Sequence, residues 1–218
     1  MQIYHFPSRS TYLERAQDVK SYFDSYVTGY FTSIEVNQGS NYADVDFFVS
    51  GRDTKAMTIR IANDYPKLII GGTEIYIGKS GYLLSSLVVT DNAVFVVGYV
   101  SGTYPVFCIC KSTEGGVLAA YFWSSSYGTK GIGYGSNNDI RVFSLADGSL
   151  TYYKQYAESR STGRTVGVSL ISGNAGTSKD VYIPYVASFT SITDPLKYQI
   201  GGVNYVSIGG GTFIVKSE

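Results

Sequence analysis

The sequence is short of the residues that build disulfide scaffolds, zinc sites and charged binding surfaces. Its 218 residues include one histidine, two cysteines and five prolines, and 17 basic residues balance 17 acidic ones. Two cysteines cannot form a disulfide scaffold, and one histidine leaves too few ligands for a zinc site. The formal net charge of zero provides no long-range attraction to nucleic acid or to an anionic membrane. We therefore expect no metal, no nucleic acid and no membrane among its partners.

Long apolar runs are missing as well. The longest, 93–100 and 104–110, are far shorter than the roughly 20 residues of a membrane-spanning helix. The first residues do not form a basic region followed by an apolar one, so we expect no signal peptide.

The chain does contain the apolar residues of a folded globular protein. Hydrophobic residues make up 44% of the sequence and aromatic residues 15%, which is too much for a disordered chain. Near the N-terminus, apolar residues recur every three or four positions and predict one amphipathic helix over 11–28. Thr11 and Glu14 match a capping box at its start, and Gly29 lies near its expected end. The predicted apolar face comprises Tyr12, Leu13, Ala16, Val19, Phe23, Tyr26, Val27 and Tyr30.

Beyond residue 30 the apolar period changes to two, which is typical of β-strands. Strand-like segments recur about every 8–12 residues, with turn residues between them. Gly71 and Gly72 predict a tight hairpin turn. We expect a mainly β fold, an antiparallel sandwich or barrel-like meander with one N-terminal amphipathic helix. A boundary near residue 80 would divide the chain into 1–80, with the helix and first strands, and a charge-poor, β-rich 81–218; one continuous domain, 1–218, is the alternative.

Charge is distributed unevenly along the chain. Residues 81–150 contain only three basic and four acidic residues, whereas an exposed surface normally carries intermingled charges. We interpret this stretch as a surface that the protein hides against another chain, which indicates a subunit of an assembly. The 21 tyrosines suit such an interface, because their rings provide contact area and their hydroxyls tolerate water.

Residues for catalysis are few. His5, the only histidine, lies near the N-terminus, and no Ser/His/acid or Cys/His arrangement can be assembled around it from the sequence. A glycosidase needs only two carboxylates, but no acidic residue stands in a distinctive sequence setting. We expect no enzymatic activity and no cofactor, with a hydrolase that uses paired carboxylates as a remaining alternative.

Two further pairs of residues have alternative interpretations. Asp44 and Asp46 lie on one face of a predicted strand, where they could contact a divalent cation or be solvated residues of an outer face. Cys108 and Cys110 also share a strand face, and we interpret them as reduced, buried small hydrophobic residues.

The segment 121–139 is the candidate binding site. It combines the only tryptophan with tyrosine, serine, glycine and asparagine, which binding loops use for contact area and adaptable hydrogen bonds. Aromatic faces also stack on sugar rings, so glycans are candidate ligands. The alternative is a core strand followed by a long surface loop. The candidate binding residues are Trp123, Tyr127, Tyr134, Asn137 and Asn138.

Three features occur together in this chain. They are a short polar N-terminus with one helix, the charge-poor Gly/Ser/Tyr strands of 81–150, and the closing Gly-Gly-Val-Asn-Tyr-Val-Ser-Ile-Gly-Gly-Gly-Thr-Phe-Ile-Val-Lys-Ser-Glu. This combination resembles the virion structural proteins of tailed bacteriophages, in the broad sense of capsid, decoration, tail or fibre components. The resemblance implies self-assembly with copies of the chain or other virion proteins, in a virion assembled in the bacterial cytoplasm, without catalysis or a cofactor. The alternative function is a carbohydrate-binding or host-adhesion module.

Overall fold

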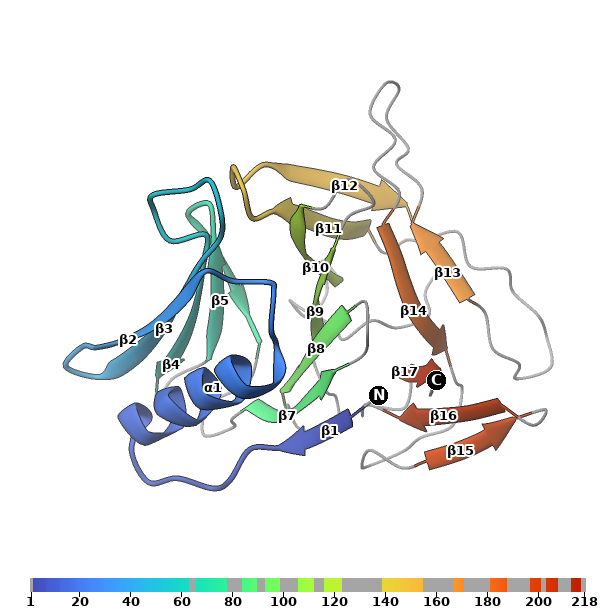
Figure 1. Ribbon diagram of the computed structural model, residues 1–218, viewed down its shortest axis with the longest axis horizontal. Coiled ribbons are helices and arrows are strands. Elements are labelled where there is room, and N and C mark those ends of the chain that lie inside the picture. The colour runs from blue at the N-terminus through green and yellow to red at the C-terminus, as the bar shows by residue number, and fades with distance from the viewer. Residues whose placement is uncertain are drawn as a thin grey trace.

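The computed structural model is built from antiparallel β-sheets and one helix (Figure 1). Its described residues form a seven-stranded sheet and two five-stranded sheets. The mainly β, antiparallel fold with one N-terminal helix is thus confirmed, and no barrel closes among the described strands. The structure describes residues 2–62, 66–77, 84–89, 93–98, 106–111, 116–122 and 139–154, and the strand backbones at 167–170, 181–187, 197–200, 203–207 and 213–216.

Each sheet is formed by strands that follow one another along the chain, except that the first strand of the chain joins the seven-stranded sheet. The central sheet has the order β1 (Gln2–His5), β7 (Leu84–Val89), β8 (Ala93–Gly98), β9 (Val106–Lys111), β10 (Val117–Phe122), β11 (Asp139–Ser144) and β12 (Leu150–Lys154). The N-terminal sheet has the order β2 (Ser33–Gln38), β3 (Tyr42–Phe48), β4 (Met57–Ala62), β5 (Lys67–Ile70) and β6 (Thr73–Tyr76). The C-terminal sheet has the order β13 (Gly167–Leu170), β14 (Val181–Ala187), β17 (Phe213–Lys216), β16 (Val203–Ser207) and β15 (Lys197–Ile200).

Helix α1 (Tyr12–Tyr26) matches the predicted helix to within two residues at each end. The Thr11 hydroxyl accepts a hydrogen bond from the backbone N–H of Glu14 (3.2 Å), and the Glu14 carboxylate accepts one from the backbone N–H of Thr11 (3.2 Å). This capping box is the one predicted. Its hydrogen bonds favour the carboxylate and lower the pKa of Glu14.

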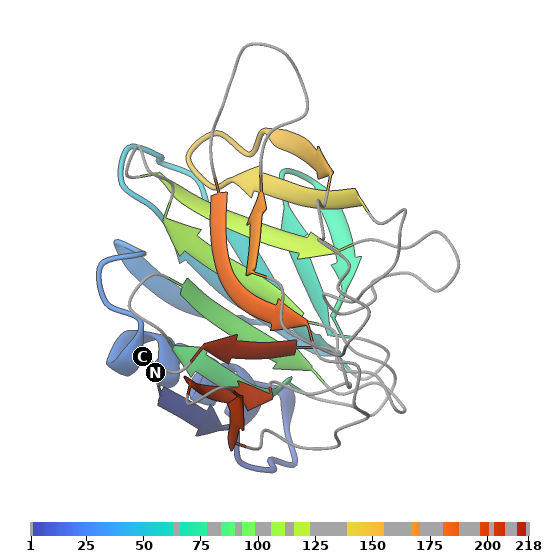
Figure 2. The ribbon, with the colours of Figure 1, turned by 90° about the vertical axis from the view of Figure 1, so that its right-hand side faces the viewer.

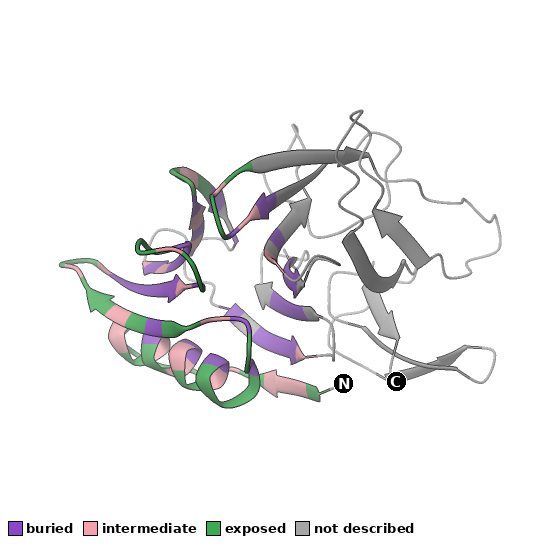
Figure 3. Ribbon diagram, turned by 45° about the horizontal axis from the view of Figure 1, so that its top comes forward, coloured by how far each residue is buried: buried purple, intermediate pink, exposed green. Residues whose placement is uncertain are grey.

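One side of α1 packs on the N-terminal sheet, and the opposite side is exposed (Figure 3). The buried side is formed by Ala16, Val19 and Phe23. Among the described residues, no helix has the length and apolar character that crossing a bilayer requires.

The sequence predicts no strand before the helix, yet β1 forms there and pairs antiparallel with β7. Four residues are too few to reveal a period of two, and the pairing joins residues that are 81 positions apart, such as His5 and Ser86. The chain therefore starts in the central sheet, crosses to the N-terminal sheet through α1, and returns at β7. One hydrophobic core runs between these two sheets, from Phe23 in α1 to Phe107 in β9.

The central sheet lies between the other two (Figure 1), and its middle strands are buried on both faces. In β9, Phe107 and Ile109 point to one face and Cys108 and Cys110 to the other, and each is at most 1% exposed. The first face packs against the core of α1 and the N-terminal sheet, and β14 of the C-terminal sheet also contacts β9. Burial within a single chain therefore accounts for the low charge of these strands.

Two turns from different sheets meet at close range. The β5–β6 turn has φ of +56° at Gly71 and +79° at Gly72, which confirms the predicted hairpin and favours glycine at both positions. A Cβ on Gly71 would lie 2.9 Å from the backbone oxygen of Gly148, in the β11–β12 turn. Nearby, Arg52 Nη1 donates a hydrogen bond to the carbonyl oxygen of Leu145 (2.9 Å). These contacts join the N-terminal sheet to the central sheet.

Alanine substitutions in this turn distinguish two losses of unfolding free energy: the loss from a side chain at positive φ and the loss from a clash between the two turns. Gly72→Ala places a side chain at positive φ in open space, and we expect a loss of about 1–2 kcal/mol in unfolding free energy. Gly71→Ala adds the clash with Gly148, so we expect about 1 kcal/mol more than for Gly72→Ala. Urea unfolding of both variants measures the difference, and equal losses would contradict the tight contact between the turns.

Candidate functional site

The candidate binding segment connects two paired strands of the central sheet. β10 ends at Phe122 and β11 begins at Asp139, and the two strands are antiparallel neighbours in which Phe122 pairs with Ile140. The residues that join them lie outside the described part of the structure, so their role in binding stays a prediction. They include all five candidate binding residues: Trp123, Tyr127, Tyr134, Asn137 and Asn138.

The described residues contain a second group of aromatic side chains, where β1 meets α1. We call Tyr4, Phe6, Tyr22 and Tyr26 the aromatic cluster. Tyr4 stacks on Tyr26 with 3.6 Å between ring centroids, Tyr22 meets Tyr26 edge-on at 5.8 Å, and Phe6 stacks on Tyr22 at 5.0 Å. A continuous series of ring contacts therefore joins the end of the helix to the first strand.

Tyr26 is the part of the aromatic cluster that faces solvent. It is 40% exposed and is the one large hydrophobic side chain that is exposed among the described residues. The helical period had placed it on the apolar face together with Val19 and Phe23, which are buried as predicted. The period fails at Tyr26 because this ring stacks on Tyr4 of β1, which is an edge strand, so part of the ring stays in solvent. Tyr26 adjoins the partly buried Tyr4 and Tyr22, so aromatic surface is contiguous here, and contiguous apolar surface is what marks interaction sites.

The charged side chains next to the aromatic cluster neutralise one another. Residues 9–24 contain three basic and three acidic side chains. Arg9 forms a two-pronged ion pair with Asp18 (2.6 and 3.0 Å), and Lys20 pairs with Asp24. Arg15 donates to the backbone oxygen of Arg9, and Glu14 belongs to the helix cap. The surface around the rings is therefore polar without a net charge.

β1 also forms an edge of the central sheet, at the lower end of its strands in Figure 2. Among the described strands, β7 is the one that pairs with it. Its four residues include no lysine, acidic residue or proline, the residues that usually protect exposed edges from pairing with another chain. The edge strands β2, β6, β12 and β15 each carry a charged residue: Glu35, Glu74, Lys154 and Lys197. The remaining edge strand, β13, resembles β1 in having no charged residue and no proline.

The fold brings His5 next to a serine, a contact that no pattern in the sequence predicts. His5 Nδ1 lies 3.0 Å from Ser86 Oγ across the β1–β7 pair. Ser86 is only 1% exposed, so its hydroxyl is closed to a substrate from solvent. The contact thus joins β1 to β7 and does not present an open nucleophile.

Asp44 and Asp46 are not the solvated outer-face residues that the sequence suggested. They are 6% and 5% exposed, on the face of the N-terminal sheet that points away from α1. Asp44 accepts two hydrogen bonds from Arg60, both 2.8 Å, and the Arg60 guanidinium lies 4.1 Å from the ring centroid of Tyr42. The hydrogen bonds that Arg60 donates to the Asp44 carboxylate raise the pKa of Arg60 further above its already high value.

Asp46 is held by three donors. Its carboxylate accepts hydrogen bonds from Thr58 Oγ1 (2.5 Å), Asn37 Nδ2 (2.9 Å) and Lys55 Nζ (3.2 Å). The carboxylate oxygens of both aspartates therefore accept hydrogen bonds from donors within the protein, as those of buried carboxylates usually do. In the part of the chain that the structure describes, no three His, Cys, Asp or Glu side chains gather in a way that could hold a metal ion.

Cys108 and Cys110 are free and fully buried, which confirms their interpretation as small hydrophobic residues. Burial raises the pKa of the Cys108 thiol well above its ordinary value. A buried thiol that resists ionisation is a poor nucleophile. Burial also raises the pKa of Tyr30 to about 12, and the Cys108 and Cys110 thiols add to this shift.

The raised pKa of Tyr30 predicts a loss of stability at alkaline pH. Because the neutral phenol is favoured in the folded state, its contribution is complete below pH 10 and disappears as the pH rises through about 12. Between about pH 9 and 11, the wild type should lose roughly 1 kcal/mol more unfolding free energy than Tyr30→Phe. Urea unfolding across this range measures both proteins, and parallel pH dependences would contradict the prediction.

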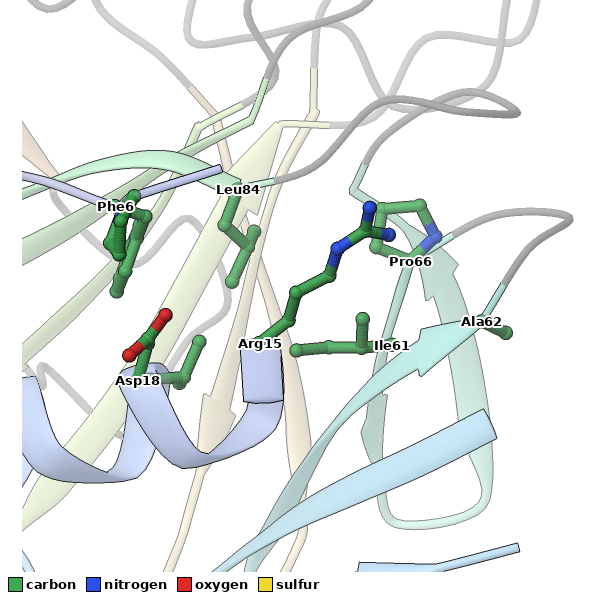
Figure 4. Close-up of a pocket in the computed structure, with 9 residues that line it drawn as sticks. Phe6, Arg15, Asp18, Ile61, Ala62, Pro66 and Leu84 are labelled. Carbon is green, nitrogen blue, oxygen red and sulfur yellow. The ribbon is translucent and has the colours of Figure 1, made fainter. Parts of the chain in front are cut away.

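A small cavity lies between the start of α1, the β4–β5 connection and the start of β7 (Figure 4). Its volume is about 20 Å³, which is room for a water molecule and too little for an organic ligand. Arg15 extends towards Pro66 at this site, while the lining is largely apolar, with Phe6, Ile61 and Leu84. We therefore do not interpret it as a substrate site.

The chain has no detectable similarity to proteins of known function. No family model matches it, and neither a curated protein nor a solved structure is significantly similar. We therefore infer the function from the residues and contacts of the chain itself.

Proposed function

We propose that this chain is a structural protein that acts by binding other protein chains, either copies of itself or partners, without catalysing a reaction. The observation that carries the proposal is the aromatic cluster beside β1, with one ring exposed and a neutral surround. Tyrosine-rich, uncharged patches are typical of protein interfaces, because the rings supply apolar area and the hydroxyls remain satisfied in water. An uncharged edge strand adds backbone groups that a partner can pair with.

The polar groups elsewhere support a binding role over a catalytic one. Asp44 and Asp46 are committed to Arg60 and Thr58, and Ser86 is closed to solvent. A general acid or base must reach the proton that it transfers, and these groups are engaged inside the fold. Their contacts are those of residues that stabilise the sheets.

The more specific proposal is that the assembly is the virion of a tailed bacteriophage, and that the chain is one of its capsid, decoration, tail or fibre components. It is supported by the resemblance of the sequence, by the β-rich fold and by the tyrosine-rich surface. Mass spectrometry of purified particles should detect the polypeptide at the copy number of a structural component. Particles that lack it would contradict the virion proposal, and a chain found in no protein complex would contradict the broader one.

A carbohydrate-binding or host-adhesion module is the second candidate. The observation that favours it is the length of the β10–β11 connection, which contains the sixteen residues 123–138, against about two to five in an ordinary hairpin. If the chain is such a module, its affinity for glycans should drop at least tenfold when Trp123 and Tyr127 are replaced with alanine. A folded protein that binds no member of a broad glycan panel would exclude this function.

A further inference from the structure

We propose that β1 of one molecule pairs antiparallel with β1 of a second copy, so that two central sheets join across a two-fold axis and their aromatic clusters meet. This inference rests on the proposed function and assigns it a surface and a partner. Its consequence is a dimer whose interface is formed by the N-terminal strand and the last turn of α1.

The first argument is the unprotected edge. β1 pairs with β7 on one side, and among the described strands none is hydrogen-bonded to its second side. An edge that lacks lysine, acidic residues and proline pairs readily with another strand. Because the chain is the same, the second copy offers an edge of equal length and the same absence of charge. Antiparallel pairing around a two-fold axis makes such a contact self-complementary.

The second argument is the position of Tyr4. It pairs with Leu87 in β7 and lies on the face of the central sheet that packs towards α1. A two-fold axis perpendicular to the sheet keeps this face on the same side in both molecules. In a pairing centred on Tyr4, the two Tyr4 rings would be about 5 Å apart at their Cβ atoms. The Tyr4–Tyr26 stack of one copy would then lie beside that of the other, which covers the exposed Tyr26 ring.

The third argument is charge. The chain has a formal net charge of zero, and so do residues 9–24 around the aromatic cluster. Their charges form internal pairs such as Arg9–Asp18, so a strongly charged partner finds no complement here. A second copy meets no repulsion, and proteins without net charge associate more readily. Charge complementarity therefore favours a second copy over an acidic or basic partner.

The expected affinity is modest, because each strand contributes only four residues. Backbone pairing of this length is marginal alone, so the contact depends on the aromatic rings. We expect a dissociation constant of about micromolar for the isolated dimer, and tighter association where many copies are held together.

An isosteric charge substitution tests the interface. Gln2 is exposed on β1, and its Oε1 accepts the hydrogen bond of the Tyr4 hydroxyl, which Gln2→Glu preserves. The variant places like charges on both copies, two residues from the axis on either side, and we expect the dissociation constant to rise about twofold at low salt and less at high salt. The matched control is Gln38→Glu, the same change at the exposed end of β2, which should leave association unchanged. Sedimentation equilibrium measures all three proteins.

A charge swap strengthens the test. A mixture of Gln2→Glu and Gln2→Lys proteins should associate more tightly than Gln2→Glu alone, because opposite charges on the two copies then attract across the two-fold axis. Equal dissociation constants for the wild type and Gln2→Glu, or no gain in the mixture, would overturn the inference.

Amide hydrogen exchange of residues 2–6 in the wild type gives a measurement that needs no variant. Protection of these amides should increase with protein concentration if β1 pairs with another copy. Concentration-independent protection in a protein that does self-associate would assign assembly to another surface, which overturns this inference and leaves the proposed function standing.

A protein that stays monomeric but binds glycans, and loses this binding on Tyr26→Ala, would overturn the inference and assign the aromatic cluster to sugar binding.

Discussion

Replacing Phe47 with alanine should lower the free energy of unfolding by about 3–5 kcal/mol. The Phe47 side chain in β3 is fully buried and packs 4.9 Å from the ring centroid of Phe23 in α1 and 4.8 Å from that of Phe31. Removing it leaves a cavity where the helix meets the N-terminal sheet, and the surrounding rings can close only part of it. Urea unfolding followed by circular dichroism measures the loss.

The adjacent residue provides the control. Phe48 lies on the opposite face of β3 and is only partly buried. Because part of its surface stays in water, we expect Phe48→Ala to cost about half as much or less. Equal losses for the two variants would contradict the assignment of the core to the face that carries Phe47.

The second large effect is expected at Asp46. Asp46→Ala removes the acceptor of Thr58, Asn37 and Lys55 and leaves the buried Thr58 hydroxyl without this partner. Because an unsatisfied buried polar group is expensive, we expect a loss of about 3 kcal/mol. Thermal and urea unfolding measure it.

Two variants separate the hydrogen bonds from the ion pair. Asp46→Asn keeps an oxygen acceptor of the same shape, so we expect a smaller loss than for Asp46→Ala. Lys55→Met removes the ion pair alone, and because the Lys55 side chain is 53% exposed, the loss should be below about 1 kcal/mol. A Lys55→Met loss as large as that of Asp46→Ala would show that the ion pair dominates.

The structure changes the argument for assembly. From the sequence, the scarcity of charge in 81–150 indicated a surface hidden against another chain. In the fold, Phe95, Cys108 and Cys110 are buried completely, and the C-terminal sheet contacts the same region through β14. A protein buries apolar surface equally well against its own sheets or a neighbour, so composition cannot separate the two. The proposal for a protein interface now depends on Tyr4 and Tyr26 instead.

Local features were predictable because their physical causes lie within a few residues. The Thr11–Glu14 capping box depends on a spacing of three, and the hairpin at Gly71 depends on two adjacent residues that tolerate positive φ. Strands were predictable for the same reason, because apolar and polar side chains alternate between neighbouring residues. The capping box and the hairpin occur where the sequence predicts them.

The candidate site was predictable only in part, since its residues come from distant segments. Tyrosine content indicated interfaces, but the helical period assigned Tyr26 to the core. Asp44 and Asp46 showed the spacing of a shared strand face, but the donors that bury them, Thr58 and Arg60, come from the next strand. The sequence does contain a signal for this pairing, because Thr58 and Arg60 are two positions apart, as Asp44 and Asp46 are.

The sequence by itself determined the class of fold, the helix, the strands that follow the helix and the zero net charge, because periodicity depends on neighbouring residues and composition does not depend on the fold. Only the tertiary structure decided which surfaces remain exposed, because burial depends on which segments pair. The pairing of β1 with β7 brings Tyr4 to Tyr26, and the close approach of Gly71 to Gly148 joins two sheets. Such long-range pairings depend on the summed burial of many side chains, so no single segment of the sequence reveals them.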